Sequence, residues 1–160
     1  MTDLVPDCAR CAALCCRLTS FARSEDFAFT RHAGEACRHL AGHRCAVHAE
    51  RIERGLQGCT VYSCFGAGQA LTLRLGGVAP SVAIRAFGAL VRVHEALFVL
   101  DVLAARFPAH PSIEAMTREV RARASLSPAE LAELRDDDHR GLRALVTELA
   151  RAPADQGAGR

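Results

Sequence analysis

Lysine, asparagine and tryptophan are absent from the 160 residues, and tyrosine occurs once. All 20 basic residues are therefore arginines, and with 18 acidic residues they leave a formal net charge of +2. A nucleic-acid binder needs a concentrated basic face to neutralise phosphates, so this balance predicts no nucleic-acid partner. The chain is 50% hydrophobic and 24% charged, which is typical of a globular protein.

Targeting segments are also lacking. Residues 1–7 contain neither a basic run nor an apolar run, so we expect no secretory signal. The most apolar stretch, residues 80–107, carries Arg85, Arg92, Glu95 and Asp101 at spacings that a bilayer core would not accept. These features predict a cytoplasmic protein without a membrane partner, whose thiols stay reduced.

Cysteine is missing beyond residue 64, although eight cysteines occur before it. They are Cys8, Cys11, Cys15, Cys16, Cys37, Cys45, Cys59 and Cys64. Such clustering indicates that the thiols act together, as a disulfide framework, a metal site or a redox pair. In a reducing compartment disulfides are rare, which favours metal binding by all eight.

The spacing of these thiols restricts the kinds of metal site that they could form. Cys8 and Cys11 have the two-residue separation that lets both sulfurs reach one metal from a tight turn. Cys15 and Cys16 are adjacent and point in different directions, so they would serve two metals, or one metal and a core position. Eight thiolates suit two tetrahedral zinc sites, but equally one four-iron cluster with thiols to spare, or a polynuclear site. All-sulfur ligation excludes magnesium and calcium.

The sequence divides near Gly76 and Gly77. We expect a mainly α fold in which a small, irregular, metal-stapled module, residues 1–79, packs on a C-terminal bundle of three to four helices, residues 80–152. Residues 153–160 are expected to be disordered. In the module we predict a helix over 8–18 capped by Asp7, short strands over 27–30 and 70–75, helical turns over 48–54, and a loop over 65–69.

The second half has clearer helix signals. A long helix should run from Pro80 to about Arg106, and Ser112 should cap a second helix. Ser127-Pro128-Ala129-Glu130 is typical of a capping box with proline at the first helical position. A last helix should follow the acidic run 136–138, which would offset its macrodipole.

Three blocks in the first half resemble a known family. They are Cys8-x₂-Cys11-x₃-Cys15-Cys16, then Cys37-Arg-His-Leu40 with Gly42-His-Arg-Cys45-Ala-Val-His48-Ala-Glu-Arg51, and Gly58-Cys59-Thr-Val-Tyr62-Ser-Cys64-Phe65-Gly66-Ala67-Gly68-Gln69. They resemble the YkgJ-type cysteine cluster family, described as zinc- or iron-chelating, and within it the cysteine-rich N-terminal region of actinobacterial pentapeptide-repeat proteins. The resemblance covers roughly residues 8–69. Here three residues precede the paired cysteines where the family usually has two, and no pentapeptide repeats follow.

The resemblance implies metal chelation, and a similar cysteine block in flagellin lysine methylase implies that iron–sulfur enzyme chemistry is an alternative. We therefore expect metal ions as partners, zinc first and an iron–sulfur cluster second, in a metal-stabilised scaffold or in metal handling. The rival functions are an iron–sulfur-dependent enzyme that modifies a protein or peptide substrate, and a thiol redox sensor. With two zinc ions on eight thiolates, the formal charge falls to about −2.

Other residues have plainer interpretations. His32, His39, His43 and His48 lie among the cysteines and are expected to support the thiols rather than replace them. Tyr62 is expected to be structural. His94, on the long helix, is expected to form a hydrogen bond within the bundle rather than to bind metal.

Overall fold

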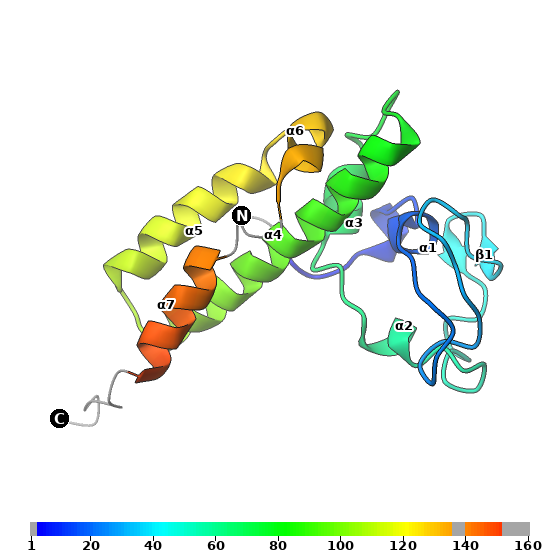
Figure 1. The fold of residues 1–160 in the computed structure, drawn as a ribbon, viewed down its shortest axis with the longest axis horizontal. Helices are drawn as coiled ribbons and strands as arrows, with labels where there is room; N and C mark the ends of the chain where they lie inside the picture. Colours follow the sequence, from blue (N-terminus) through cyan, green and yellow to red (C-terminus); the bar gives the residue numbers. More distant parts are fainter. Residues whose placement is uncertain (1–2, 136–139, 152–160) are drawn as a thin grey trace.

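The computed structural model describes residues 3–135 and 140–151, and these residues form a mainly helical fold, as predicted. Figure 1 shows the long helices at one end of the molecule and the short elements of the cysteine module at the other. The expected disorder of 153–160 and the acidic run 136–138 lie outside the described residues.

The central helix is α4 (Pro80–Arg106), which runs the length of the bundle (Figure 1). Pro80 occupies the first turn, where its missing N–H costs nothing, and the helix ends before Pro108, as the sequence predicts. Its buried face includes Phe87, Leu90 and Leu97, each at most 1% exposed. Because this face contacts α3, α5 and α6, helix α4 is the hydrophobic centre of the protein.

The remaining helices of the bundle are α5 (Pro111–Ala124), α6 (Pro128–Glu133) and α7 (Arg140–Arg151). Helix α6 begins with the predicted capping box: Ser127 Oγ accepts a hydrogen bond from the Glu130 backbone N–H, and the Glu130 carboxylate accepts one from the Ser127 backbone N–H. The predicted cap of α5 is wrong, because the capping position is taken by His110, two residues before Ser112. Pro111 takes the first helical position after His110, and Ser112 makes no capping bond.

The module contains only short regular elements in the part of the chain that the structure describes. They are the 3₁₀ helix η1 (Cys8–Arg10), α1 (Leu14–Leu18), the antiparallel pair β1 (Leu40–Ala41) and β2 (Arg44–Cys45), α2 (Gly58–Val61) and α3 (Ala67–Thr72). The predicted Asp7 cap is present, because Asp7 Oδ1 accepts from the Ala9 N–H at 2.9 Å. The continuous helix over 8–18 is wrong, since Ala13 has a left-handed backbone (φ 57°) that separates η1 from α1.

Both predicted strands of the module are wrong. Residues 27–30 are irregular, with a bend at 28–29, and the extended contact nearby is an isolated bridge between Phe21 and Arg31. Residues 70–72 belong to helix α3, which also takes up part of the predicted loop. The alternating pattern of residues 70–75 wrongly predicted a strand. Leu73 is 93% exposed, whereas Ala67 and Leu71 are buried together on one face of the helix.

Buried hydrophobic side chains are scarce in the module. Across residues 15–66, all of which the structure describes, only Val47 and Leu56 are buried hydrophobic residues. The main core is built from α1, α3 and the C-terminal helices, and Cys11, Cys15 and Cys64 pack against it. About 50 ordered residues cannot recover their conformational entropy from two such side chains, so the outer loops need another source of stability.

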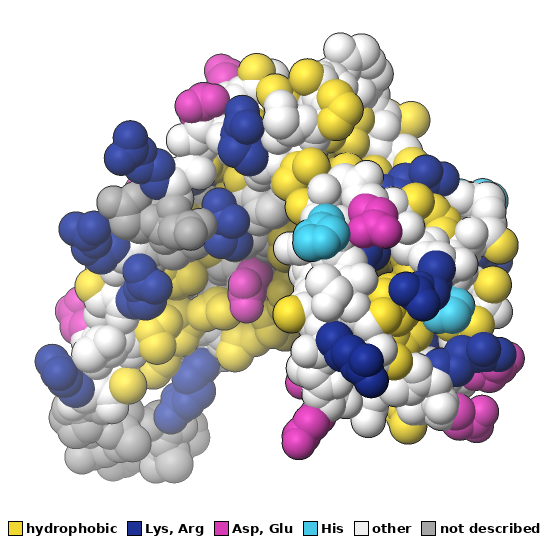
Figure 2. Space-filling model, turned by 45° about the vertical axis from the view of Figure 1, so that its right-hand side comes forward, with side chains coloured by type: hydrophobic (Ala, Val, Ile, Leu, Met, Phe, Trp, Pro, Cys, Tyr) yellow, Lys and Arg dark blue, Asp and Glu magenta, His cyan; other side chains and the backbone are white. Residues whose placement is uncertain are grey.

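None of the described helices is both long enough and apolar enough to cross a membrane. The space-filling view in Figure 2 shows hydrophobic side chains gathered between its left-hand and right-hand lobes. Exposed apolar residues include Phe98 and Val102 on α4 and Val61 on α2.

Candidate metal centre

The eight cysteines lie in the module and carry no disulfide bond. Cys8 and Cys11 belong to η1 and its C-terminus, Cys15 and Cys16 to α1, and Cys64 to the loop before α3. Cys37 precedes the β-hairpin, Cys45 ends it, and Cys59 lies in α2. Cys8 is exposed and the other seven are partly buried.

Four of the thiols gather at the base of the module, and we call Cys8, Cys11, Cys15 and Cys64 the inner group. Burial, then the charges of Cys11 and Cys64 and, from outside this group, Cys16, raise the pKa of the Cys8 thiol. The charges of Cys11 and Cys64 also act on Cys15. Gly68 brings the sulfurs of Cys11 and Cys64 together, because a Cβ at Gly68 would lie 2.7 Å from the first and 3.7 Å from the second.

Helix α3 holds the inner group in place. Gln69 accepts a hydrogen bond from the Asp7 backbone N–H and donates one to the Val5 carbonyl. Thr72 Oγ1 accepts from the Ala12 N–H at 3.0 Å. These bonds attach the N-terminal segment to the helix that follows Cys64, so thiols more than 50 residues apart along the chain meet at one place.

Two strained residues border this group. Ala13 and Phe65 have positive φ angles of 57° and 46°, which cost non-glycine residues about 1 kcal/mol or more each. The Phe65 carbonyl accepts a hydrogen bond from Nδ1 of the buried His94 at 2.7 Å. His94 is thus hydrogen-bonded as expected, but its partner belongs to the module rather than to the bundle. Strain of this kind concentrates at functional sites because the surrounding structure must hold it.

The other four thiols, Cys16, Cys37, Cys45 and Cys59, form the outer group. The Cys37 N–H donates to the Cys16 carbonyl at 2.8 Å, and the hairpin pairs Leu40 with Cys45. Burial, then the charges of Cys16, Cys37 and Cys45, raise the pKa of Cys59. Burial likewise raises the pKa of Cys45, opposed by a bond from the Val47 N–H to its sulfur.

The inner and outer groups meet at the adjacent residues Cys15 and Cys16. Their Sγ atoms are 4.0 Å apart, and the Cys15 S–H donates to the Cys16 sulfur. This bond is the main reason that the pKa of Cys16 is lowered to about 6, and that the pKa of Cys15 is raised. The expectation that these two side chains point in different directions is therefore wrong, because their sulfurs are in contact and link the inner group to the outer group.

A buried arginine lies on the peptide that joins the groups. Arg31 is 3% exposed, and its guanidinium donates to the carbonyls of Cys15 and Cys16 and to Thr19 Oγ1. Its Nε is buried without a hydrogen-bond partner. Sequence reasoning missed this residue, because nothing distinguishes Arg31 from the other arginines before the loops are folded.

The donor set fits a thiophilic metal. Each group offers four sulfurs, the ligand number of a tetrahedral zinc site, and Gly68 leaves room where a side chain would displace Cys11. As the side chains stand, no set of three or more His, Cys, Asp or Glu residues within 3–135 and 140–151 is arranged closely enough to hold an ion. Metal binding would therefore require the sulfurs of a group to rotate toward one another.

The histidines and Tyr62 lie around the thiols. The His39 ring contacts Phe29 edge to face, and His32, His43 and His48 are exposed. Burial raises the pKa of Tyr62, which is partly covered beside Cys15 and Cys64. Supporting roles for these histidines stay a prediction.

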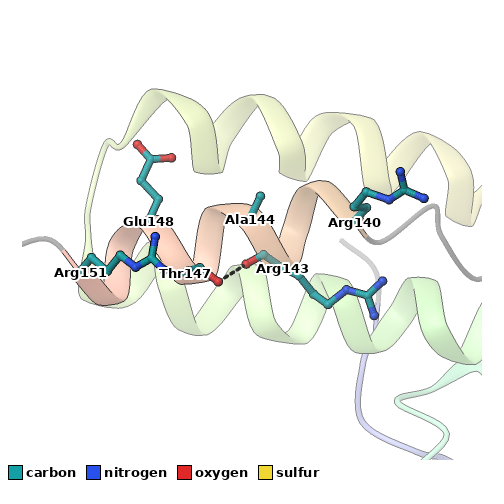
Figure 3. A pocket seen from close by; sticks show the side chains of 6 residues that line it. All are labelled: Arg140, Arg143, Ala144, Thr147, Glu148 and Arg151. Carbon is teal, nitrogen blue, oxygen red and sulfur yellow. Dashed lines mark hydrogen bonds between the residues drawn. The ribbon is translucent and has the colours of Figure 1, made fainter.

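A surface hollow of about 580 Å³ lies elsewhere, on α7 (Figure 3). It is lined by Arg140, Arg143, Ala144, Thr147, Glu148 and Arg151. In Figure 3 the long side chains extend away from one another, and the drawn bond runs from Thr147 Oγ1 to the Arg143 carbonyl. The hollow contains no cysteine and is open, so it is not part of the thiol centre.

The chain is similar to one curated protein, the Bacillus subtilis (strain 168) protein YybG, which is described as uncharacterized. The two are 33% identical over 150 residues, which covers 86% of this chain and 54% of YybG. No protein-family model and no solved structure matches the chain. This chain thus spans about half the length of its relative.

Proposed function

We propose that this chain is a metal-binding protein in which the inner and outer groups each hold one metal ion, zinc in the first place, and that the ions staple the module to the bundle. Its resemblance to the YkgJ-type family leads us to propose membership of that family as well. We place the protein in the reducing cytoplasm, with metal ions as its partners, a protein partner or substrate as a further one, and no nucleic acid or membrane.

The observation that carries this proposal is that the fold brings cysteines distant in the sequence together: the sulfurs of Cys11 and Cys64 both lie over Gly68, and those of Cys15 and Cys16 are 4.0 Å apart. Eight thiols provide the number of ligands that two tetrahedral zinc sites need. The scarcity of buried hydrophobic residues over 15–66 adds support, because ligation of structural zinc contributes about 10–16 kcal/mol of folding free energy in small domains.

Zinc would act here as a fixed charge and a cross-link. Four protein sulfurs leave no open position for a substrate, which favours a scaffold or a metal-handling role over catalysis. An iron–sulfur cluster remains the alternative, since the same thiolates suit iron, and it would favour an enzyme that modifies a protein or peptide. A thiol redox sensor is the third candidate, because oxidation of Cys15 and Cys16 would release the ions.

Metal analysis of anaerobically purified protein tests the identity of the metal. We expect a colourless protein with about two zinc ions per chain. A brown protein with acid-labile sulfide would instead establish the iron–sulfur alternative. A folded, metal-free protein with four disulfides would contradict all forms of metal binding.

Paired substitutions test the grouping. The single variants Cys11→Ser and Cys45→Ser should each lose one zinc ion. The double variant Cys11→Ser/Cys64→Ser should also lose one, because both residues belong to the inner group, whereas Cys11→Ser/Cys45→Ser should lose both. His48→Ala is the matched control and should retain two ions. Loss of both ions from the Cys11/Cys64 variant would refute the grouping.

A further inference from the structure

The C-terminal half of α4 carries an apolar strip, Phe98 and Val102, that faces solvent. Phe98 is 47% exposed and Val102, one turn further on, is 54% exposed. Ile84 lies on the same side of the helix as Val102 but is covered by the module, because a Cβ on Gly34 would be 3.1 Å from its Cδ1. The module reaches along this side as far as the Phe65 ring, whose centroid is 5.3 Å from that of Phe98. The strip therefore begins where the cover of the module ends.

Two exposed residues of opposite charge border the strip. Glu95 precedes Phe98, and Arg106 follows Val102. They are eleven residues apart, which is about three helical turns, so both side chains leave α4 on the same side. Among residues 3–135 and 140–151, neither Glu95 nor Arg106 forms an ion pair. Arg106 instead contacts the ring of Phe107, 5.3 Å from its centroid.

The order of these four residues is complementary to itself. If a second α4 packed antiparallel about a two-fold axis between Phe98 and Val102, Phe98 would lie opposite the partner's Val102. The same axis would place Glu95 opposite the partner's Arg106, and each of these contacts would occur twice. A parallel second copy would instead place each charge opposite its own like. The charges and the apolar residues are thus matched together by one occupant, an antiparallel second copy of this chain.

We propose that the strip is a homodimer interface in which two copies of α4 pack antiparallel, with Glu95 paired to the partner's Arg106. The overlap from Glu95 to Arg106 is about 16 Å of helix, which makes a small interface. The dimer should therefore be weak and dissociate on dilution. The inference is independent of the proposed metal binding, because α4 contains no cysteine.

Sedimentation equilibrium of the full chain under reducing conditions tests the apolar contact. The mass should rise toward twice that of one chain as the concentration increases from micromolar to about 1 mM. Phe98→Glu and Val102→Glu should both abolish this rise, because the dimer would bury two uncompensated charges. Val102→Glu is the cleaner variant, since Phe98 also packs on Phe65, and unchanged circular dichroism shows that it is folded. Leu73→Glu, at a leucine that is 93% exposed on another element, is the control and should dimerise as the wild type does.

Charge reversal tests the antiparallel orientation. Glu95→Arg and Arg106→Glu should each weaken the dimer about tenfold, because two attractive pairs become two repulsive ones. An equimolar mixture of these two variants should associate as tightly as the wild type, since opposite charges meet again in both pairs. Glu133→Arg is the matched control, because Glu133 lies 3.9 Å from Arg85 near the other end of α4.

Three results would overturn the inference. The first is a wild-type chain that remains monomeric up to about 1 mM. The second is a folded Val102→Glu variant that dimerises as the wild type does, which would assign the dimer to another surface. The third is a mixture of Glu95→Arg and Arg106→Glu that associates no more tightly than either variant alone. In each case the metal content of the protein would be unaffected, so the proposed function would be judged separately.

Discussion

The Cys11 sulfur lies directly over Gly68, so that a methyl group on Gly68 would be 2.7 Å from it. No real Cβ atom approaches sulfur so closely, and the contact can be relieved only if the thiol rotates away. A free thiol can rotate at little cost, but a thiolate fixed by an ion cannot. The effect of a larger residue at Gly68 therefore depends on whether metal is bound.

We predict that Gly68→Ala weakens the inner site while leaving the metal-free protein almost unaffected. Alanine also favours helix by about 1 kcal/mol, which offsets part of any cost in the metal-free state. Affinity for the inner ion should fall about tenfold, as expected for overpacking worth 1–3 kcal/mol. Zinc competition and thermal melts with and without metal measure both quantities.

Gly76→Ala is the control for this substitution. Nothing lies within 4 Å of a Cβ built on Gly76, and its φ angle is not positive. Zinc affinity should therefore stay unchanged. Equal losses of stability in the loaded and metal-free forms of Gly68→Ala would contradict the assignment of Cys11 as a ligand.

Removal of metal should unfold the module before the bundle. The outer loops bury only Val47 and Leu56, whereas α4 buries ten residues of its own. After treatment with a strong chelator under reducing conditions, hydrogen exchange should become fast across roughly residues 20–62 and stay slow in α4. Retention of slow exchange in the β-hairpin would show that the loops do not depend on metal.

Acid should destabilise the bundle through His94. Burial, the largest effect, lowers the pKa of His94, although its bond to the Phe65 carbonyl opposes this shift. Above a pH of about 6.5, the ordinary histidine pKa, the folded and unfolded chains are both neutral at this residue and the stability is complete. As the pH falls further, the unfolded chain takes up the proton first, so the free energy of unfolding decreases until the lowered pKa is passed.

The variant His94→Asn isolates this effect, because asparagine can donate to the Phe65 carbonyl but does not titrate. It should be less stable than the wild type at pH 8, since a smaller side chain leaves a cavity, yet should lose less stability between pH 7 and pH 5. Denaturant unfolding at both pH values measures the difference. Parallel pH profiles for the two proteins would exclude His94 as the titrating group.

The capping box of α6 should contribute measurably to stability. Ser127→Ala removes the acceptor for the Glu130 N–H and should cost about 1 kcal/mol. Ser112→Ala, at a serine that makes no capping bond, should change stability little. Urea denaturation distinguishes the two, and equal effects would mean that the cap is not formed in solution.

The bundle could be predicted from local signals because those signals act over one or two helical turns. Pro80, Pro108 and the Ser127–Glu130 pair each set a helix boundary through a backbone rule that needs no distant contact. The start of α5 was misplaced because serine is a common cap, yet Pro111 fits the first turn better. The alternating pattern of residues 70–75 predicted a strand, but the tertiary packing of α3 makes residues 70–72 helical.

The membership of the two thiol groups could not be predicted in the same way. The sequence indicated eight candidate ligands and a division at Cys15 and Cys16, but Cys64 joins Cys11 only because Gln69 and Thr72 bind the N-terminal segment. Arg31 was missed because its burial depends on loops that carry almost no secondary-structure signal. Such contacts depend on the whole fold rather than on a neighbouring turn.

The adjacency of Cys15 and Cys16 also bears on the order of folding. Closure of the inner group brings together chain positions about 50 residues apart. The entropic cost of closing a loop grows only logarithmically with its length. This one closure therefore already includes most of the conformational entropy that the chain would lose if the outer group closed by itself. Cys16 and Cys59 are then each within five residues of a fixed point along the chain. The β-hairpin can therefore complete the outer group by a short-range conformational search. The slow event in folding should be the closure of the inner group rather than the formation of the loops.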